Sequence, residues 1–144
     1  MELIDPQNPR LLTNLEVLKL IKDKLESKKK VRRQQTLLYT GAKYLNTKSP
    51  CSKQEESGVQ GFANDVKVFN LTKSEILMLI NHCPSSQVEL SVVSPIIISD
   101  LDSRLSNSQT DQLLQLVEKH FPDGVTASQM INSTGTLEAS EDIT

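Results

Sequence analysis

The segment "LTKSEILMLINHCPSSQVEL", residues 71–90, decides the fold because it specifies where one helix begins, where that helix ends and where the next one begins. Thr72 and Glu75 form a Thr-x-x-Glu capping box, in which each side chain binds the other residue's backbone amide. Leu71 precedes this box and is spaced to pack on Ile76 as a hydrophobic staple. The apolar run that follows predicts a short helix that must be buried.

The second half of the segment predicts a joint between two helices. Pro84 disfavours helical geometry at the residue before it, so the first helix should end near His82 and Cys83. Ser86 and Glu89 form another capping box, which predicts that a new helix begins there. A helix-turn-helix joint of this kind indicates a helical bundle.

Three further helices are predicted upstream and a fourth downstream. Thr13 and Glu16 form the capping box of the first helix, and Ser106 and Gln109 form that of the last. Apolar residues recur at helical spacing in the upstream helices. These residues are Leu15, Leu18, Ile21 and Leu25, then Leu38, Ala42 and Leu45, then Val59, Phe62, Ala63, Val66 and Phe69.

Two prolines and the polar end of the chain complete this outline. Pro95 should break the helix that begins at Ser86, and helical spacing resumes after it. Pro122 should stop the last helix. Residues 122–144 are polar, carry four acids and no Lys or Arg, and have no sustained apolar period. We therefore expect an acidic disordered tail over 122–144.

Composition favours one all-α domain. The chain has 144 residues, of which 37% are hydrophobic, with five Gly and six Pro, too few turn signals for many short strands. Its N-terminus lacks the apolar core of a signal peptide, and no stretch reaches the roughly 20 apolar residues of a membrane span. The expectation is a soluble intracellular protein with no membrane contact.

Charge is distributed unevenly along the chain. Residues 1–53 carry twelve Lys and Arg against five Asp and Glu, whereas residues 54–121 carry four against nine. The basic excess includes a cluster of Lys28, Lys29, Lys30, Arg32 and Arg33. Such a cluster is compatible with a nuclear import signal, with contacts to nucleic-acid phosphates, or with a solvated linker. The sequence leaves these alternatives open.

No pattern in the chain predicts catalysis, a metal or a cofactor. Cys83 could pair with His82 or His120 as a nucleophile, but adjacent helical residues point about 100° apart and no oxyanion-hole motif accompanies them. Cys51 and Cys83 have no second ligand at the spacing of a structural zinc site. None of the five glycines falls in a phosphate-binding pattern. An interaction protein is therefore favoured over an enzyme.

An arm before the first helix points to a partner. The prolines of "PQNPRLL" keep this stretch out of the helix, and it presents Leu11 and Leu12. Two leucines on a non-helical arm need an apolar surface to cover them.

The order of these pieces resembles the small stalk subunit of RNA polymerase III, also called the calcitonin gene-related peptide receptor component protein family. The resemblance covers most of residues 10–121 and rests on "LLTNLEV", "YLNTKSPC", "LTKSEILMLINHCPSSQVELSVV" and "RLSNSQTDQLLQLV". Its sharpest part is Leu71, Thr72, Lys73, Ser74, Glu75, Leu77, Leu79, Asn81, Pro84, Val88, Glu89 and Leu90, which stand in the family's order.

The resemblance implies an HRDC-like helical bundle, related to the small stalk subunits of RNA polymerase II and of archaeal polymerase. It implies a larger stalk subunit with an OB-fold domain as the partner, attachment to the polymerase III core, and a nuclear location. It also implies a role in initiating tRNA and 5S rRNA genes with transcription factor IIIB, and it makes RNA a further candidate partner. The residues that would bind the larger subunit are Leu11, Leu12, Thr13, Asn14, Glu16 and Val17.

We therefore predict four parts: an N-terminal arm and partner-binding helix (1–27), a basic linker (28–35), an HRDC-like helical bundle (36–121) and the tail (122–144). The alternative is a free HRDC-type module that binds single-stranded nucleic acid through the basic linker.

Overall fold

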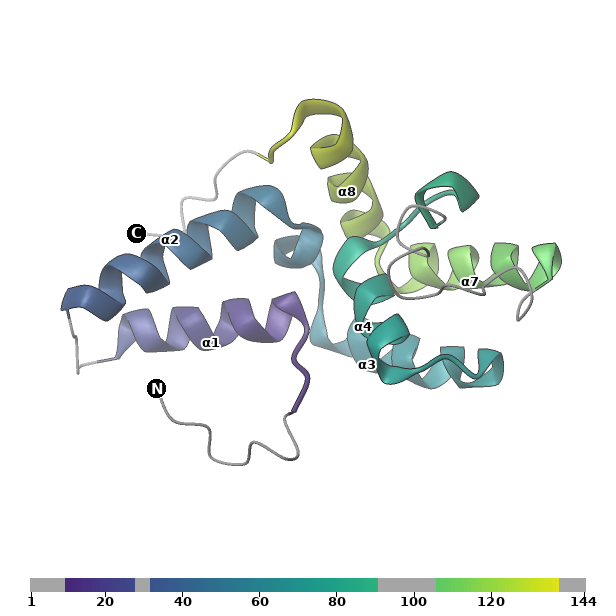
Figure 1. Cartoon of the computed structure of the whole chain (residues 1–144), viewed down its shortest axis with the longest axis horizontal. Helices are drawn as coiled ribbons and strands as arrows, with labels where there is room; N and C mark the ends of the chain where they lie inside the picture. Colours follow the sequence, from purple (N-terminus) through teal and green to yellow (C-terminus); the bar gives the residue numbers. More distant parts are fainter. Residues whose placement is uncertain (1–9, 28–31, 91–105, 138–144) are drawn as a thin grey trace.

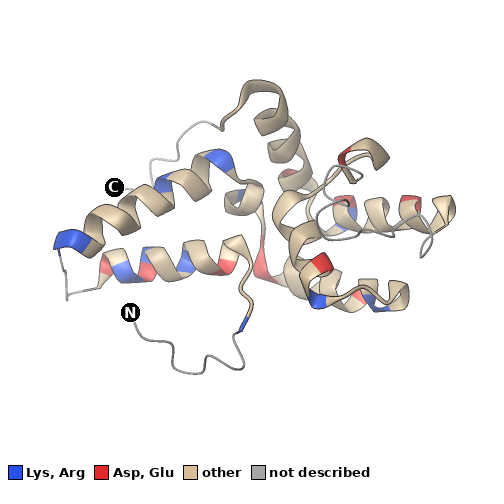
Figure 2. Ribbon diagram, in the orientation of Figure 1, with Lys and Arg blue, Asp and Glu red and all other residues tan. Residues whose placement is uncertain are grey.

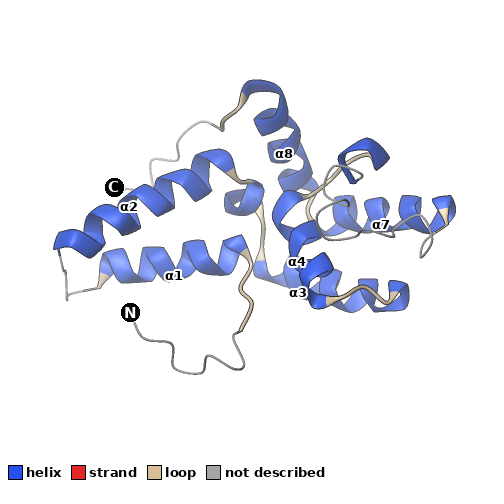
Figure 3. Ribbon diagram, in the orientation of Figure 1, coloured by secondary structure: helices blue, strands red, loops and turns tan. Residues whose placement is uncertain are grey.

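The computed structural model describes residues 10–27, 32–90 and 106–137 of the chain. Every regular element in this described part is a helix, which confirms the all-α expectation (Figure 3). The elements are α1 (Asn14–Glu26), α2 (Arg32–Lys48), the 3-10 helix η1 (Pro50–Lys53), α3 (Glu56–Asp65), the 3-10 helix η2 (Val66–Phe69), α4 (Lys73–His82), α7 (Asn107–His120) and α8 (Pro122–Thr134). Residues 87–90 are also helical.

The helices form two groups that meet at η1. Helices α1 and α2 lie side by side as an antiparallel hairpin, and α3, α4, α7 and α8 pack together beyond one end of it (Figure 1). The short η1 contacts α1, α2, α4 and α8, so it is the junction between the two groups.

The hairpin has a small core of its own. Its buried residues are Leu15, Leu18, Ala42 and Cys51, with Ile21, Leu25, Leu45 and Val59 packed against them. The apolar residues predicted for the first two helices therefore face each other, apart from Leu38, which lies outside this cluster. As a result, the apolar stripe of α1 packs on α2 and η1 of the same chain.

The second group surrounds a larger core. It contains Phe62, Val66, Phe69, Leu79, Ile80, Cys83, Leu90, Leu113, Val117, Phe121 and Val125. The rings of Phe62 and Phe121 pack with their centroids 5.5 Å apart and so join α3 to the end of α7. Val59 packs against both cores and connects the hairpin with the larger group.

The predicted capping boxes start the helices as expected. At α4, the Glu75 amide donates to Thr72 Oγ1 at 3.2 Å, and the Thr72 amide donates to the Glu75 carboxylate at 2.9 Å. The boxes at α1 and α7 are also reciprocal. The box before residues 87–90 differs on its acidic side, because the Glu89 carboxylate accepts from the amide of Ser85 (2.7 Å) in place of Ser86.

The prediction of a disordered tail is wrong for residues 122–134, which form α8. Pro122 begins this helix, where its missing N–H costs nothing, and Gly135 ends it with a left-handed φ of 85°. The residues that α8 buries are small: Gly124, Val125, Ala127 and Ser128. Small side chains give a weak apolar period yet allow close packing on η1. Residues 138–144 lie outside the described residues.

Two other predicted boundaries change. Helix α2 already begins at Arg32, so the linker predicted for 28–35 is wrong from that residue onward, and residues 28–31 lie outside the described part. The third helix becomes 3-10 after Asp65 and ends at Asn70, which adopts a left-handed φ of 53°. The helix predicted after Pro95 also lies outside the described residues.

The last turn of α4 is where the groups are tied together. Cys83 takes a left-handed conformation (φ 46°) that ends the helix. The Gln54 side chain donates to the Ile80 carbonyl, Ser128 Oγ donates to the His82 carbonyl at 2.8 Å, and the Asn14 amide donates to Asn81 Oδ1 at 2.9 Å. These donors come from the residue after η1, from α8 and from α1.

The segment after α8 binds back to the hairpin. The Leu137 amide donates to the Thr47 carbonyl at 2.7 Å, and Lys48 Nζ donates to the Gly135 carbonyl at 2.8 Å. Leu137 is itself buried. The ends of α2 and α8 are therefore fastened together although they are far apart in sequence.

Replacing Thr72 with Ala should lower the free energy of unfolding by about 1 kcal/mol, because it removes the acceptor for the Glu75 amide. Urea denaturation followed by circular dichroism measures the change. Thr72→Ser is the matched control, since serine is an equally good cap. If Thr72→Ala and Thr72→Ser unfold at the same urea concentration, the cap does not stabilise α4.

Gly58 and Gly41 should respond to alanine in opposite directions. A Cβ at Gly58 would lie 2.6 Å from the His120 carbonyl oxygen, so Gly58→Ala should push α3 from α7 and destabilise the fold by roughly 1–3 kcal/mol. A Cβ at Gly41 would meet Ile21 Cδ1 at an ordinary 3.4 Å, so Gly41→Ala should stabilise α2 by roughly 0.5–1 kcal/mol. Thermal unfolding of both variants measures this, and a stabilised Gly58→Ala would disprove the close approach.

Candidate partner-binding site

The N-terminal arm leads into α1 at the end of the hairpin that faces the larger group (Figure 1). Leu11 is 52% exposed, and Leu12 and Val17 are half-buried. Arg10 lies next to them and makes a loose ion pair with Glu16, with 3.8 Å between Nη2 and Oε2. The arm thus presents apolar side chains beside a cation.

The polar residues predicted for partner binding hold the arm in place. Thr13 and Glu16 form the capping box of α1, with Glu16 Oε1 accepting from the Thr13 amide at 3.2 Å. Asn14 donates its backbone amide to Asn81 and its side-chain amide to Ser49 Oγ at 3.4 Å. These contacts fix the direction in which the arm leaves the molecule. Leu11, Leu12 and Val17 are the apolar members of the predicted set.

The structure separates the basic cluster from the arm. Arg32 and Arg33 are exposed in the first turn of α2, at the far end of the hairpin (Figure 2). Helix α1 has 13 residues and so rises about 20 Å between the two sites. Lys28, Lys29 and Lys30 lie outside the described residues. The helix dipole disfavours cations at a helix N-terminus, so an anion bound to Arg32 and Arg33 would stabilise the first turn of α2.

The chemistry considered for the cysteines does not fit their surroundings. Cys51 and Cys83 are both fully buried, and burial raises the pKa of the Cys83 thiol to about 12 although the Gln54 side chain opposes the shift. The thiolate is the nucleophilic form, and at neutral pH it is therefore suppressed at Cys83. His120 binds Asp65, with 2.7 Å between Nε2 and Oδ2. No three His, Cys, Asp or Glu side chains in the described residues are grouped to hold a metal.

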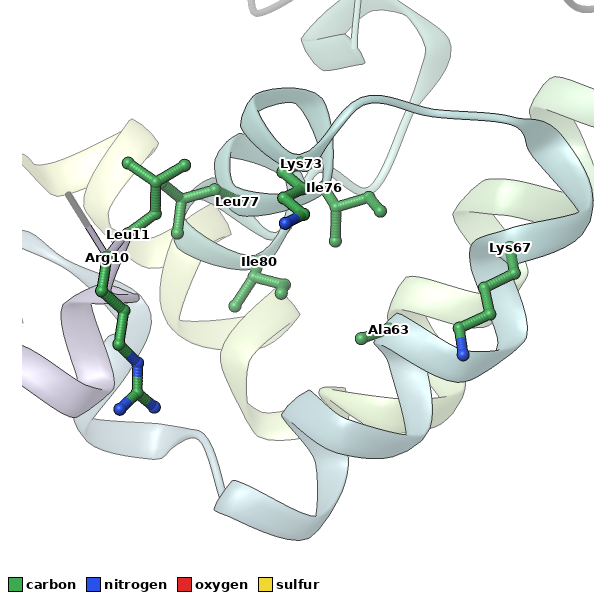
Figure 4. A pocket seen from close by; sticks show the side chains of 8 residues that line it. All are labelled: Arg10, Leu11, Ala63, Lys67, Lys73, Ile76, Leu77 and Ile80. Atoms are coloured by element: carbon green, nitrogen blue, oxygen red, sulfur yellow. The ribbon is translucent and has the colours of Figure 1, made fainter. Parts of the chain in front are cut away.

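A groove beside the arm was not foreseen from the sequence. It has a volume of about 550 Å³ and lies between α4 and the α3–η2 segment, with the arm at one end (Figure 4). Its lining residues are Arg10, Leu11, Ala63, Lys67, Lys73, Ile76, Leu77 and Ile80. Because the sequence of α4 is apolar on almost every side, its apolar side chains were predicted to be buried. Ile76 and Leu77 are in fact only partly buried, because they line this groove.

Among the helices that the structure describes, none is long and apolar enough to cross a membrane. The described surface instead offers three features: the arm with Leu12 and Val17, the groove next to it, and the arginines at the tip of the hairpin.

Comparison with known families identifies the chain. Residues 11–121 match the family model of RNA polymerase Rpb4. The match begins in the arm, includes the hairpin and α3, α4 and α7, and stops just before α8. The chain therefore belongs to the RNA polymerase Rpb4 family, and it is a non-catalytic small stalk subunit of a multisubunit RNA polymerase, which pairs with the other stalk subunit.

Proposed function

We propose that this chain is the small stalk subunit of RNA polymerase III. In this role it forms a heterodimer with the larger OB-fold stalk subunit and supports initiation of tRNA and 5S rRNA genes in the nucleus. The observation that carries the proposal is the motif at residues 71–90, which resembles the polymerase III branch within a chain of the Rpb4 family.

Several residues of the motif make contacts that support this proposal. Thr72 and Glu75 cap α4, and Asn81 accepts the Asn14 amide at the base of the arm. The motif therefore builds the support from which the arm leaves the molecule. Shared residues at these positions favour a shared placement of the arm, and with it a shared partner.

The proposed contact surface for the larger subunit consists of accessible apolar side chains on the arm and on α1. Leu12 and Val17 are half-buried, and Leu20, which follows Val17 by three residues, is 50% exposed. Burying an aliphatic side chain of this size contributes roughly 1.5–3 kcal/mol, so a few such residues can anchor the arm. Thr13, Asn14 and Glu16 contribute by holding the arm in the orientation that the partner meets.

The remaining parts of the proposal concern the bundle and its other contacts. The HRDC-like bundle, predicted over residues 36–121, would include most of α2 together with α3, α4 and α7. The stalk would reach transcription factor IIIB and emerging RNA. Arg32 and Arg33 are exposed and have no carboxylate partner within 4.0 Å among the described residues. This observation also favours the alternative, in which the free chain binds single-stranded nucleic acid through its basic cluster.

Co-expression with the larger stalk subunit should yield a stable heterodimer that survives size-exclusion chromatography. The double change Leu12→Asp and Val17→Asp should weaken pairing at least tenfold, because it places two charges in an apolar contact. Val88→Asp is the matched control, since Val88 is 75% exposed and lies outside the proposed surface. A double variant that folds and pairs like the unchanged chain would contradict this surface.

Affinity purification of the tagged chain from nuclear extract should recover the polymerase III core. Mass spectrometry of the purified complex distinguishes the large subunits of polymerase III from those of polymerase II. Adding back the purified heterodimer to depleted extract should restore transcription of a tRNA template. Recovery of polymerase II subunits alone would assign the chain to the other stalk and would overturn the proposal.

A further inference from the structure

The groove beside α4 combines an apolar floor with a basic rim. Ala63, Ile76, Leu77 and Ile80 supply aliphatic surface, and Leu11 of the arm closes one end. Figure 4 shows Lys67 and Lys73 on elements at opposite sides of the opening, with Arg10 beside Leu11. The lining therefore offers one surface for apolar groups and another for anionic groups.

The positive charge of the rim is not balanced within the described part of the chain. Among the described residues, no Asp or Glu lines the groove. Arg10 has only a loose contact with Glu16 at 3.8 Å, and neither Lys67 nor Lys73 has a carboxylate within 4.0 Å among the described residues. Lys73 is also the first residue of α4, where the helix dipole adds positive potential. An anionic occupant would be favoured on electrostatic grounds.

We propose that this groove binds an acidic amphipathic helix of a partner protein. Aliphatic side chains on one face of that helix would enter the floor, and flanking carboxylates would meet Lys67, Lys73 and Arg10. Both long walls of the groove are helical segments, so a helix laid into it follows the helix-in-groove mode of recognition.

A nucleic acid fits this groove less well than a helix. The described residues of the lining include no aromatic side chain on which a base could stack, and the aliphatic floor offers phosphates nothing to bind. The groove shares Leu11 with the predicted partner-binding set, but its other lining residues except Arg10 lie on α3, η2 and α4, so it extends the proposed function and does not depend on the polymerase III assignment.

Peptide display tests the proposal with a defined probe. The library contains 18-residue helices with Leu, Ile or Ala at positions spaced i, i+3, i+4 and i+7 and with random polar residues elsewhere. It is selected against the full chain, and the best peptide is labelled for fluorescence anisotropy. We expect the selected peptides to be enriched in Asp and Glu, with affinity that falls as salt rises.

Variants of the chain locate the binding. Lys67→Glu with Lys73→Glu should weaken the acidic peptide at least tenfold and should shift a repeated selection toward Lys and Arg. The matched control is Lys24→Glu with Lys43→Glu, which makes the same change in net charge on exposed positions of the hairpin and should alter affinity less than twofold. Ala63→Trp should block the groove by filling it, and the charge variants keep the test valid if this variant does not fold.

Three outcomes would overturn the proposal. The first is a selection without preference for acidic residues, and the second is equal loss of affinity in the groove variants and the hairpin control. The third concerns residues 1–9, which contain Glu2 and Asp5 and directly precede Arg10. If deleting this segment raises peptide affinity tenfold or more, the groove belongs to the chain's own N-terminus and not to a partner.

Discussion

The last turn of α4 is the constraint on which the rest of the structure depends. Its backbone carbonyls at Ile80 and His82 and its Asn81 side chain accept hydrogen bonds from Gln54, Ser128 and Asn14, which come from three separate parts of the chain. A helix end leaves its final carbonyls without partners inside the helix. Here these free carbonyls become the attachment points for the junction and for α8, and the neighbouring side chain holds α1.

This arrangement explains how a small helical protein can present an arm in a defined direction. The arm begins where Asn14 is bound to Asn81, so its position is set by the bundle and not by the hairpin alone. Because the apolar stripe of α1 is used inside the hairpin, Leu11 and Leu20 are the large apolar side chains of the described arm and α1 that stay exposed.

Local patterns in the sequence predicted much of the fold but less of the site. The capping boxes at Thr13, Thr72 and Ser106 are confirmed because they involve only residues three positions apart. Helix α8 was missed although Pro122 and Gly135 mark its ends, because its buried face consists of small residues with a weak apolar period. The groove was also missed, since Lys67 and Ile76 line it from two elements whose packing no local pattern describes.

The sequence by itself determined where the helices with capping boxes begin, which apolar residues pack, and to which family the chain belongs. These properties depend on neighbouring residues or on the order of a motif. Only the tertiary structure decided that α1 packs on its own hairpin, that Asn81 anchors the arm, and that a basic-rimmed groove lies beside it. Each of these joins residues far apart in the chain, and such pairs are selected by close packing and hydrogen-bond geometry in three dimensions.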